Sequence, residues 1–211
     1  MFKPSRGSAK FPCACICVTA TYAFQYETGP SPVYVSLSTP SSPYAGGITS
    51  GVLCPSRFVR GSYFLENWEP ELVALRNGDV LNTFLNADHK IPQVAVRDLG
   101  NVIAEVLVQP RRGHHVIEFT GPADWSPVEI AESMGEVSAK SVRVQQWPVA
   151  AAADALAGFG IPRPVAVLIQ EMYEGLDSGY ITLESPQTAR RGRIPAKDAL
   201  ADMWREIGAG G

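Results

Sequence analysis

The sequence predicts an α/β domain, because strand patterns alternate with amphipathic helix patterns along most of the chain. Residues 99–107 place apolar side chains at the i, i+3, i+4, i+7 and i+8 positions of one helix face. Residues 115–119 form a short run rich in β-branched side chains, which is typical of a strand. Ser126, Pro127 and Glu129 then combine an N-cap, a proline at the first helical position and a glutamate at the third, which predicts a helix start.

The first half of the chain gives weaker signals. A strand is expected at Val33–Leu37, before a stretch rich in Ser and Pro, and another ends at Phe58-Val59. A helix is expected at residues 67–76, because Asn77-Gly78 is a good C-terminal cap. Residues 80–84 predict a further strand.

An extended apolar segment is expected at residues 91–96. Asp98 is expected to be the N-cap of the helix that carries the 99–107 stripe. Beyond the capped helix that starts at Ser126, we expect two strands, at residues 141–147 and 179–183. We also expect three helices, at residues 149–157, 162–174 and 196–207. The second of these helices should end at Gly175 and the third at Gly208.

Composition limits the function and the location of the chain. The formal net charge is −3 and no basic block occurs, so we expect no nucleic-acid partner. No run of eighteen or more apolar residues occurs, so no membrane span is expected. Residues 1–26 loosely imitate a targeting peptide but lack a good cleavage site, and we expect a cytoplasmic protein.

Charge is distributed unevenly and suggests two parts. Residues 1–56 hold four charged side chains, and residues 57–211 hold the other 35 of 39. We therefore expect an irregular amino-terminal segment over residues 1–56, with one strand, followed by an ordered α/β part over residues 57–211.

Cysteine and histidine give little support for a metal site. Cys13, Cys15 and Cys17 alternate along a possible strand, but no second ligand pair accompanies them. His114 and His115 would point to opposite faces of a strand. We expect reduced thiols, surface histidines and no metal.

Familiar catalytic motifs are absent from the sequence. No Gly-x-Gly-x-x-Gly, Gly-Lys-Ser/Thr or Gly-x-Ser-x-Gly occurs, and no tyrosine is followed by a lysine four residues later. The catalytic residues are therefore unknown at this point. The basic cluster at residues 190–193 is expected to be a solvated turn, with contact to an anionic group as the alternative.

The stretch from Ser56 to Trp68 is the best candidate for a site, because a strand end, a glycine and a polar-aromatic helix start follow one another within it. Glu66 and Asn67 are polar residues in an aromatic frame, and either cap the next helix or line a ligand site. Arg60 either neutralises a phosphate or pairs with Glu66.

Residues 58–68 resemble the corresponding strand and turn of NmrA-like proteins, which are atypical short-chain dehydrogenases that bind NAD(P). Further resemblance lies in residues 91–100, 119–122, 126–131, 171–181 and 191–192, in the same order. It covers about residues 57–211. The resemblance implies a partial Rossmann-like fold, with an incomplete parallel sheet and a carboxyl-terminal subdomain on the substrate side.

The resemblance also implies roles for particular residues. Those matching the stretch beside the nicotinamide half of the cofactor are Arg60, Gly61, Tyr63 and Phe64. Those matching the substrate-side wall are Glu66, Asn67 and Trp68.

By resemblance, the function is hydride transfer between NAD(P) and a small carbonyl or quinone substrate. The glycine loop that anchors the pyrophosphate is missing, which argues against tight NAD(P) binding. We therefore expect the amino-terminal Rossmann half to be truncated or replaced. The alternatives are an NAD(P)-sensing regulator that binds a protein partner without catalysis, and a truncated inactive chain with no ligand.

Overall fold

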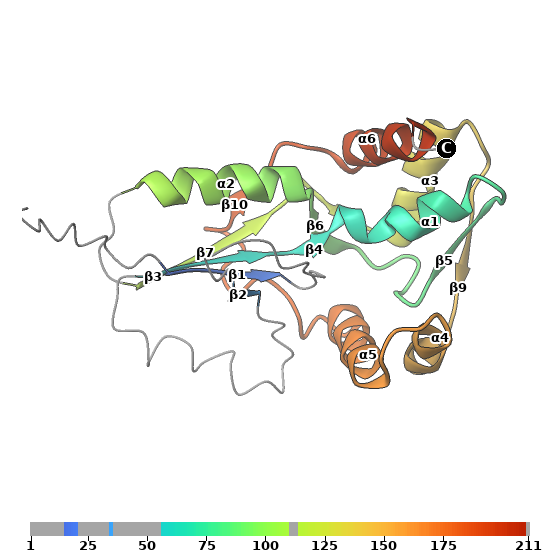
Figure 1. The fold of residues 1–211 in the computed structure, drawn as a ribbon, viewed down its shortest axis with the longest axis horizontal. Coiled ribbons are helices and arrows are strands. Elements are labelled where there is room, and N and C mark those ends of the chain that lie inside the picture. Colours follow the sequence, from blue (N-terminus) through green and yellow to red (C-terminus); the bar gives the residue numbers. More distant parts are fainter. Residues whose placement is uncertain (1–14, 21–33, 36–55, 110–113, 210–211) are drawn as a thin grey trace, which may run out of the picture.

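The computed structural model describes residues 15–20, 34–35, 56–109 and 114–209. They form an α/β fold around a five-stranded sheet in which every neighbouring pair of strands is parallel (Figure 1). The strand order is β10 (Arg190–Arg191), β7 (His114–Thr120), β3 (Ser56–Gly61), β1 (Cys15–Ala20) and β2 (Tyr34–Val35). The predicted α/β class and parallel sheet are confirmed.

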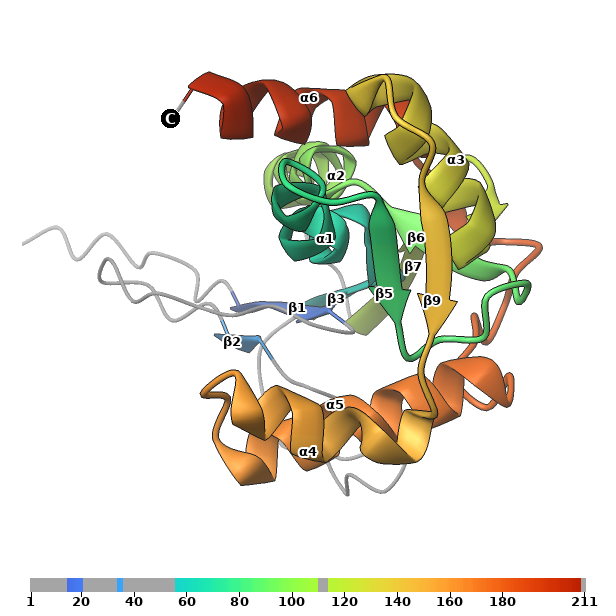
Figure 2. The ribbon, with the colours of Figure 1, turned by 90° about the vertical axis from the view of Figure 1, so that its right-hand side faces the viewer.

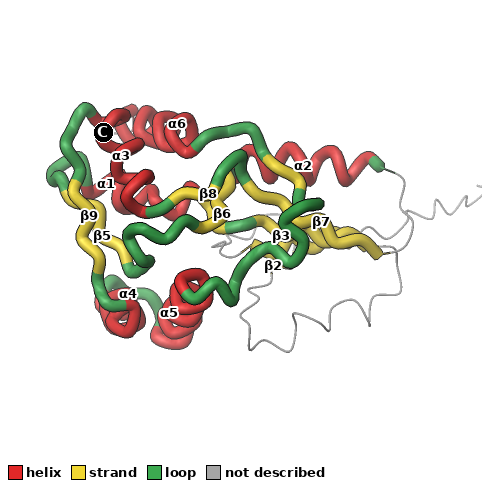
Figure 3. The backbone as a smooth tube through the Cα atoms, turned by 180° about the vertical axis from the view of Figure 1, so that it is seen from behind, coloured by secondary structure: helices red, strands yellow, loops and turns green. Residues whose placement is uncertain are grey.

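The remaining strands of the described residues form two smaller sheets. The first consists of β4 (Tyr63–Phe64), β6 (Ile91–Val94) and β8 (Asp124–Trp125), and the second of β5 (Val80–Thr83) and β9 (Arg143–Gln146). Strands β6 and β8 lie between the large sheet and the helices α1 (Glu69–Ala74) and α3 (Pro127–Ser138) (Figure 3). Strand β3 runs almost directly into β4, so the chain passes from the large sheet to the small one within three residues.

The remaining helices lie on both sides of these sheets. They are the short 3₁₀ helices η1 (Leu65–Trp68) and η2 (Val149–Ala151), and the α-helices α2 (Val96–Val108), α4 (Ala152–Gly158), α5 (Arg163–Asp177) and α6 (Ala196–Ala209). Helices α3 and α6 lie at one end of the β5–β9 pair, and α4 and α5 at the other (Figure 2).

Helix α2 covers one face of the large sheet (Figure 1). Its predicted apolar stripe supplies Leu99, Val102 and Val106, which pack on Val59 of β3 and Phe119 of β7 in one buried cluster. Leu107 belongs to the same predicted stripe but is 46% exposed. The apolar stripe therefore explains why α2 packs on the sheet. At Leu107, the last residue of the stripe, the helix no longer packs fully against the sheet.

A second and larger core joins η1 and α1 to α3, α5 and α6. It includes the fully buried side chains Leu72, Leu81, Ile130 and Leu200. Leu200 lies on the apolar face predicted for residues 196–207, and α6 occupies that position. The part of the chain that forms these helices therefore has a hydrophobic core distinct from the one under α2.

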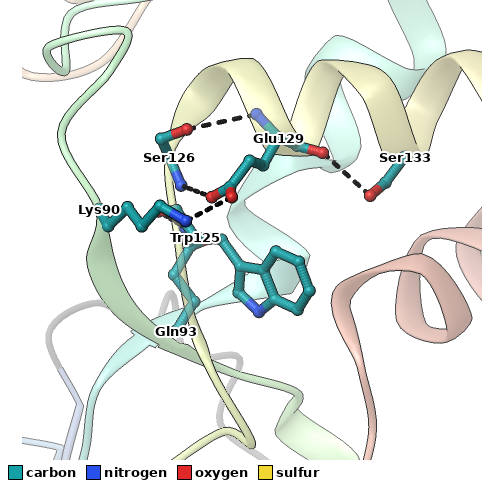
Figure 4. A network of polar contacts seen from close by, with 6 residues as sticks. All are labelled: Lys90, Gln93, Trp125, Ser126, Glu129 and Ser133. Carbon is teal, nitrogen blue, oxygen red and sulfur yellow. Dashed lines mark hydrogen bonds and ion pairs between the residues drawn. The ribbon is translucent and has the colours of Figure 1, made fainter.

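The predicted capping box at the start of α3 is confirmed (Figure 4). The Ser126 backbone N–H donates to Glu129 Oε2 at 3.0 Å, and the Glu129 backbone N–H donates to Ser126 Oγ at 3.3 Å. Lys90 Nζ lies 2.5 Å from the other oxygen of Glu129. These local contacts position the turn after β8.

Several local expectations were wrong. Helix α1 ends at Ala74, before the expected Asn77-Gly78 cap, and α6 continues past Gly208 to Ala209. Asp98 is not the N-cap of α2, because the helix begins at Val96 and Ala95 is its N-cap. Helix α5 does not end at Gly175 but continues to Asp177. Residues 179–183 form no strand, because Ile181 donates its N–H to the Gly175 carbonyl and folds back on the helix end.

The basic cluster also differs from the expected turn. Arg190 and Arg191 form β10, which pairs with the end of β7, although both side chains are exposed. Strand β1 contains two of the cysteines that alternate along the possible strand, and it pairs with β2 and β3. The expectations for Cys13 and the Ser/Pro-rich stretch lie outside the described residues, and the division at residue 56 stays a prediction.

We expect Gly121→Ala to destabilise the protein by about 1–3 kcal/mol, the usual range for overpacking. A Cβ at position 121 would lie 2.2 Å from the Gln93 carbonyl oxygen, a backbone atom that also accepts the Gly121 N–H. Urea unfolding measures the change.

Gly100→Ala is the matched control for this substitution. Gly100 is exposed in α2, and nothing lies within 4 Å of its added Cβ. Alanine is the better helix former by about 1 kcal/mol, so this variant should be stabilised. Equal effects of the two substitutions would contradict the close packing at Gly121.

Candidate functional site

The carboxyl ends of three neighbouring parallel strands lie level with one another. Ala20 of β1 pairs with Gly61 of β3, and Gly61 pairs with Phe119 of β7. In open α/β sheets, ligands bind outside this edge. The predicted site residues, 60–68, leave the sheet at this edge.

Buried hydrogen bonds hold the edge together. Ser62 donates its N–H to the Phe119 carbonyl at 3.0 Å, and its hydroxyl donates to Thr120 Oγ1 at 3.0 Å. Gly192 then donates its N–H to the Thr120 carbonyl at 2.7 Å. The chain segments after β3, β7 and β10 are therefore joined to one another at the point where a ligand would approach.

Gln93 is a functional candidate that the sequence analysis missed. Its side chain is fully buried, its Oε1 accepts from Trp68 Nε1 at 2.8 Å, and its Nε2 donates to the Trp125 carbonyl at 2.8 Å. It appears with Trp125 beside the capping box in Figure 4. The available signal was a single amide side chain within the apolar run 91–96.

Among the predicted cofactor residues, Arg60 lies at the surface. Its side chain is 33% exposed, and its Nη1 lies 2.6 Å from Glu184 Oε1. Glu118, its neighbour on β7, accepts the N–H groups of Glu184 and Ser185 at 2.8 and 2.7 Å. Arg60 therefore pairs with Glu184. The alternative in which Arg60 pairs with Glu66 is wrong.

Gly61, Tyr63 and Phe64 are buried. A Cβ on Gly61 would lie 3.1 Å from the Phe64 ring and 3.3 Å from Leu99, so the glycine makes room for protein packing. The Tyr63 ring packs edge-on against Trp68, with 6.1 Å between ring centroids. These three residues shape the chain path behind the edge, and contact of their side chains with a cofactor stays a prediction.

Tyr173 of α5 reaches the same region from the opposite side. Its hydroxyl is hydrogen-bonded to Tyr63, and its ring stacks on Phe84 at 6.1 Å. Burial raises the pKa of the Tyr173 phenol, the hydrogen bond from Tyr63 lowers it, and the Glu71 charge raises it. Tyr173 therefore holds its proton at neutral pH.

Glu66 acts as a cap, but for a different helix from the one that follows it. Its Oε1 accepts the N–H of Val96, the first residue of α2, at 2.9 Å. Its Oε2 is buried and has no hydrogen-bond donor among the described residues. Burial raises the pKa of this carboxyl above its usual range, although the N–H groups of Val96 and of Glu66 itself and the nearby Arg97 lower it.

The other two predicted substrate-side residues differ in exposure. Asn67 is partly exposed in the same turn as Glu66, whereas Trp68 is 3% exposed. The structure therefore brings Glu66 and Asn67 together at the edge, with Trp68 and Gln93 behind them. Their contact with a substrate stays a prediction.

The described part of the chain contains neither a metal-binding cluster nor a membrane-spanning helix. No group of three or more His, Cys, Asp or Glu side chains there is arranged to hold a metal ion. No helix in the same residues is long and apolar enough to cross a membrane.

No family model matches this sequence. An NAD(P)H azoreductase from Xenophilus azovorans is 25% identical over 124 residues, which is 59% of this chain and 43% of the azoreductase. The chain thus spans about half the length of the relatives it matches.

Solved structures share the fold. A nucleoside-diphosphate-sugar epimerase from Staphylococcus aureus matches with a TM-score of 0.59 and 18% identity, over 75% of this chain and 56% of the epimerase. An NADPH-dependent quinone oxidoreductase from Escherichia coli matches with a TM-score of 0.58 and 20% identity, over 71% of this chain and 55% of the oxidoreductase. A triphenylmethane reductase from Citrobacter sp. matches with a TM-score of 0.58 and 19% identity, over 72% of this chain and 54% of the reductase.

These similarities and the parallel sheet define a Rossmann-like α/β fold. Two described residues bring polar groups to the carboxyl edge of this fold. At the carboxyl edge, Glu66 offers an oxygen without a donor, and Arg60 offers a partly exposed cation. No glycine-rich loop that would hold a pyrophosphate lies among the described residues.

We expect Glu66→Gln to gain stability relative to the wild type as pH rises. Below the unfolded pKa, about 4.3, both states of the wild type carry the proton and the carboxyl contributes nothing. Above it the unfolded state releases the proton while the folded state, with its raised pKa, retains it. The wild type therefore loses stability until pH passes the folded pKa, and Gln does not.

Urea unfolding at pH values from 4 to 8 measures the difference between the two proteins. Glu132→Gln removes an exposed charge on α3 that does not act on Glu66, and it is the control for net charge. A stability difference that does not change with pH would show that burial of Glu66 has no effect on its ionisation.

Proposed function

We propose that this chain belongs to the NmrA-like lineage of NAD(P)-dependent oxidoreductases and transfers hydride to a small carbonyl, quinone or azo acceptor. The observation that carries the proposal is the sequence similarity to the NAD(P)H azoreductase, in a chain with a Rossmann-like fold. The neighbours that reduce quinones and triphenylmethane dyes support the choice of acceptor.

The proposed site lies outside the carboxyl ends of β3 and β7. When bound there, NAD(P)H supplies a hydride. Arg60 and the backbone of Gly61 lie beside the nicotinamide half, and Glu66 with Asn67 faces the substrate. The buried rings of Tyr63, Phe64 and Trp68 hold this turn in place and exclude water from behind.

Cofactor affinity is expected to be modest. The anchor for the pyrophosphate in Rossmann folds is a helix amino terminus after a glycine loop, and none lies among the described residues. In this proposal Arg60 contacts a phosphate of the cofactor. To do so, its guanidinium must leave Glu184 and pair with the ligand instead. Such an exchange depends on ionic strength, because the pair is partly exposed.

We expect NADPH to quench the tryptophan fluorescence of the protein saturably, and its oxidation to accelerate when a quinone or azo dye is added. Binding without oxidation across an acceptor panel would instead support the NAD(P)-sensing regulator. Absence of binding by folded protein would contradict the proposed function and favour a chain without a ligand.

Arg60→Ala is expected to weaken NADPH binding about tenfold, because one hydrogen bond to a charged group contributes about 1.5–3 kcal/mol. Arg143→Ala is the matched control, since Arg143 forms a comparable exposed pair with Asp79 on another sheet. Equal loss of affinity in both variants would place the contact elsewhere.

A further inference from the structure

Glu66, Glu71 and Asp177 are half-buried carboxylates that accept backbone N–H groups, and Glu66 differs from the other two. Both oxygens of Asp177 accept the N–H of Asn86. Glu71 accepts the N–H of Asn82 and a second hydrogen bond from its side chain. The Glu66 carboxylate accepts the Val96 N–H on Oε1 and is also stabilised by its own backbone N–H. Its Oε2 is buried, and no donor among the described residues meets this atom in hydrogen-bonding geometry.

We propose that Glu66 donates the proton that accompanies hydride transfer, from Oε2, to the acceptor substrate. This inference rests on the proposed function. Oε1 must keep a lone pair for the Val96 N–H, so a proton on the carboxyl belongs on Oε2. The residue lies two positions after β4, in the 3₁₀ helix η1, which the chain reaches after it leaves the carboxyl end of β3.

The surrounding charges allow Glu66 to carry this proton. Arg97 on α2 faces it, but Arg97 Nη1 lies 3.0 Å from Asp202 of α6, which offsets its charge. Glu69 on α1 adds a negative charge. Burial is the largest influence, and it favours the neutral acid.

The proposed step balances for a quinone acceptor. When bound, NAD(P)H would supply a hydride, with its electron pair, to the quinone and would thereby be oxidised by two electrons. The O–H bond of Glu66 breaks, and its proton passes to a quinone oxygen, which completes the hydroquinone. The Val96 N–H and the amino terminus of α2 then stabilise the carboxylate until water reprotonates it.

Access to Oε2 requires a small movement, because the atom is covered in this structure. The competing donor is Tyr173, whose hydroxyl is hydrogen-bonded to Tyr63 and whose pKa burial raises above that of a free phenol. A phenol of raised pKa gives up its proton less readily than a carboxyl at neutral pH. Glu66 is therefore the better donor of the two.

The test compares Glu66→Gln with Glu71→Gln, using NADPH and 1,4-benzoquinone. Glu71 is the matched control, because it also accepts a backbone N–H and has a pKa raised by burial, but lies in α1. Gln at position 66 keeps an oxygen for Val96 and lacks the acidic proton. Urea unfolding confirms that each variant folds, and Glu66→Asp, which keeps a carboxyl, should restore part of the rate.

We expect Glu66→Gln to reduce the NADPH oxidation rate about 100-fold, the lower end of general acid catalysis, and to lose the fall in rate at high pH. NADPH affinity should change by less than about twofold, and Glu71→Gln should retain the rate. Carbon-13 NMR of cofactor-free protein gives an independent readout: the side-chain carboxyl signal missing in Glu66→Gln should titrate above the usual range for glutamate.

Turnover by the wild type together with an unchanged rate and pH profile in Glu66→Gln would overturn this inference alone. An equal loss of rate in Tyr173→Phe, with Glu66→Gln unaffected, would assign the proton to the phenol. Absence of turnover by the wild type would overturn the proposed function and this inference together.

Discussion

The buried amide of Gln93 is the interaction on which the site region depends. Its side chain joins the indole of Trp68 to the carbonyl of Trp125, and its backbone carbonyl accepts the Gly121 N–H. One residue therefore links η1, β6, β8 and the segment after β7. An amide with both its donor and acceptor satisfied in the core specifies a unique arrangement, because any shift leaves polar atoms unpaired in an apolar surrounding.

Electrostatics at the edge follow from this packing. The buried aromatic residues around Gln93 hold the turn that carries Glu66, and the same burial disfavours the charged form of its carboxyl. Arg60, by contrast, remains close enough to water to exchange partners. The two candidate ligand contacts differ in solvation, which suits one of them to hold a proton and the other to bind an anion.

Features encoded by neighbouring residues were predictable from the sequence. The capping box at Ser126 lies within four residues, and the stripe of α2 follows from helix periodicity alone. Asp98 was misassigned because its carboxylate accepts N–H groups from Arg193 and Ile194, and Arg193 is 95 residues further along the chain. Gln93 was missed for the same reason, since its partners come from other strands and turns.

The pairing of β5 with β9 has a consequence for the order of folding. Val80 pairs with Arg143, and α2, β6, β7 and α3 all lie between them in the chain. Parallel pairing across such a loop costs loop-closure entropy before the contacts form, so we expect the β5–β9 pair to form only once the intervening segments have brought its strands together. The placement of α4 and α5, which follow β9 in the chain, then depends on the segments that precede it.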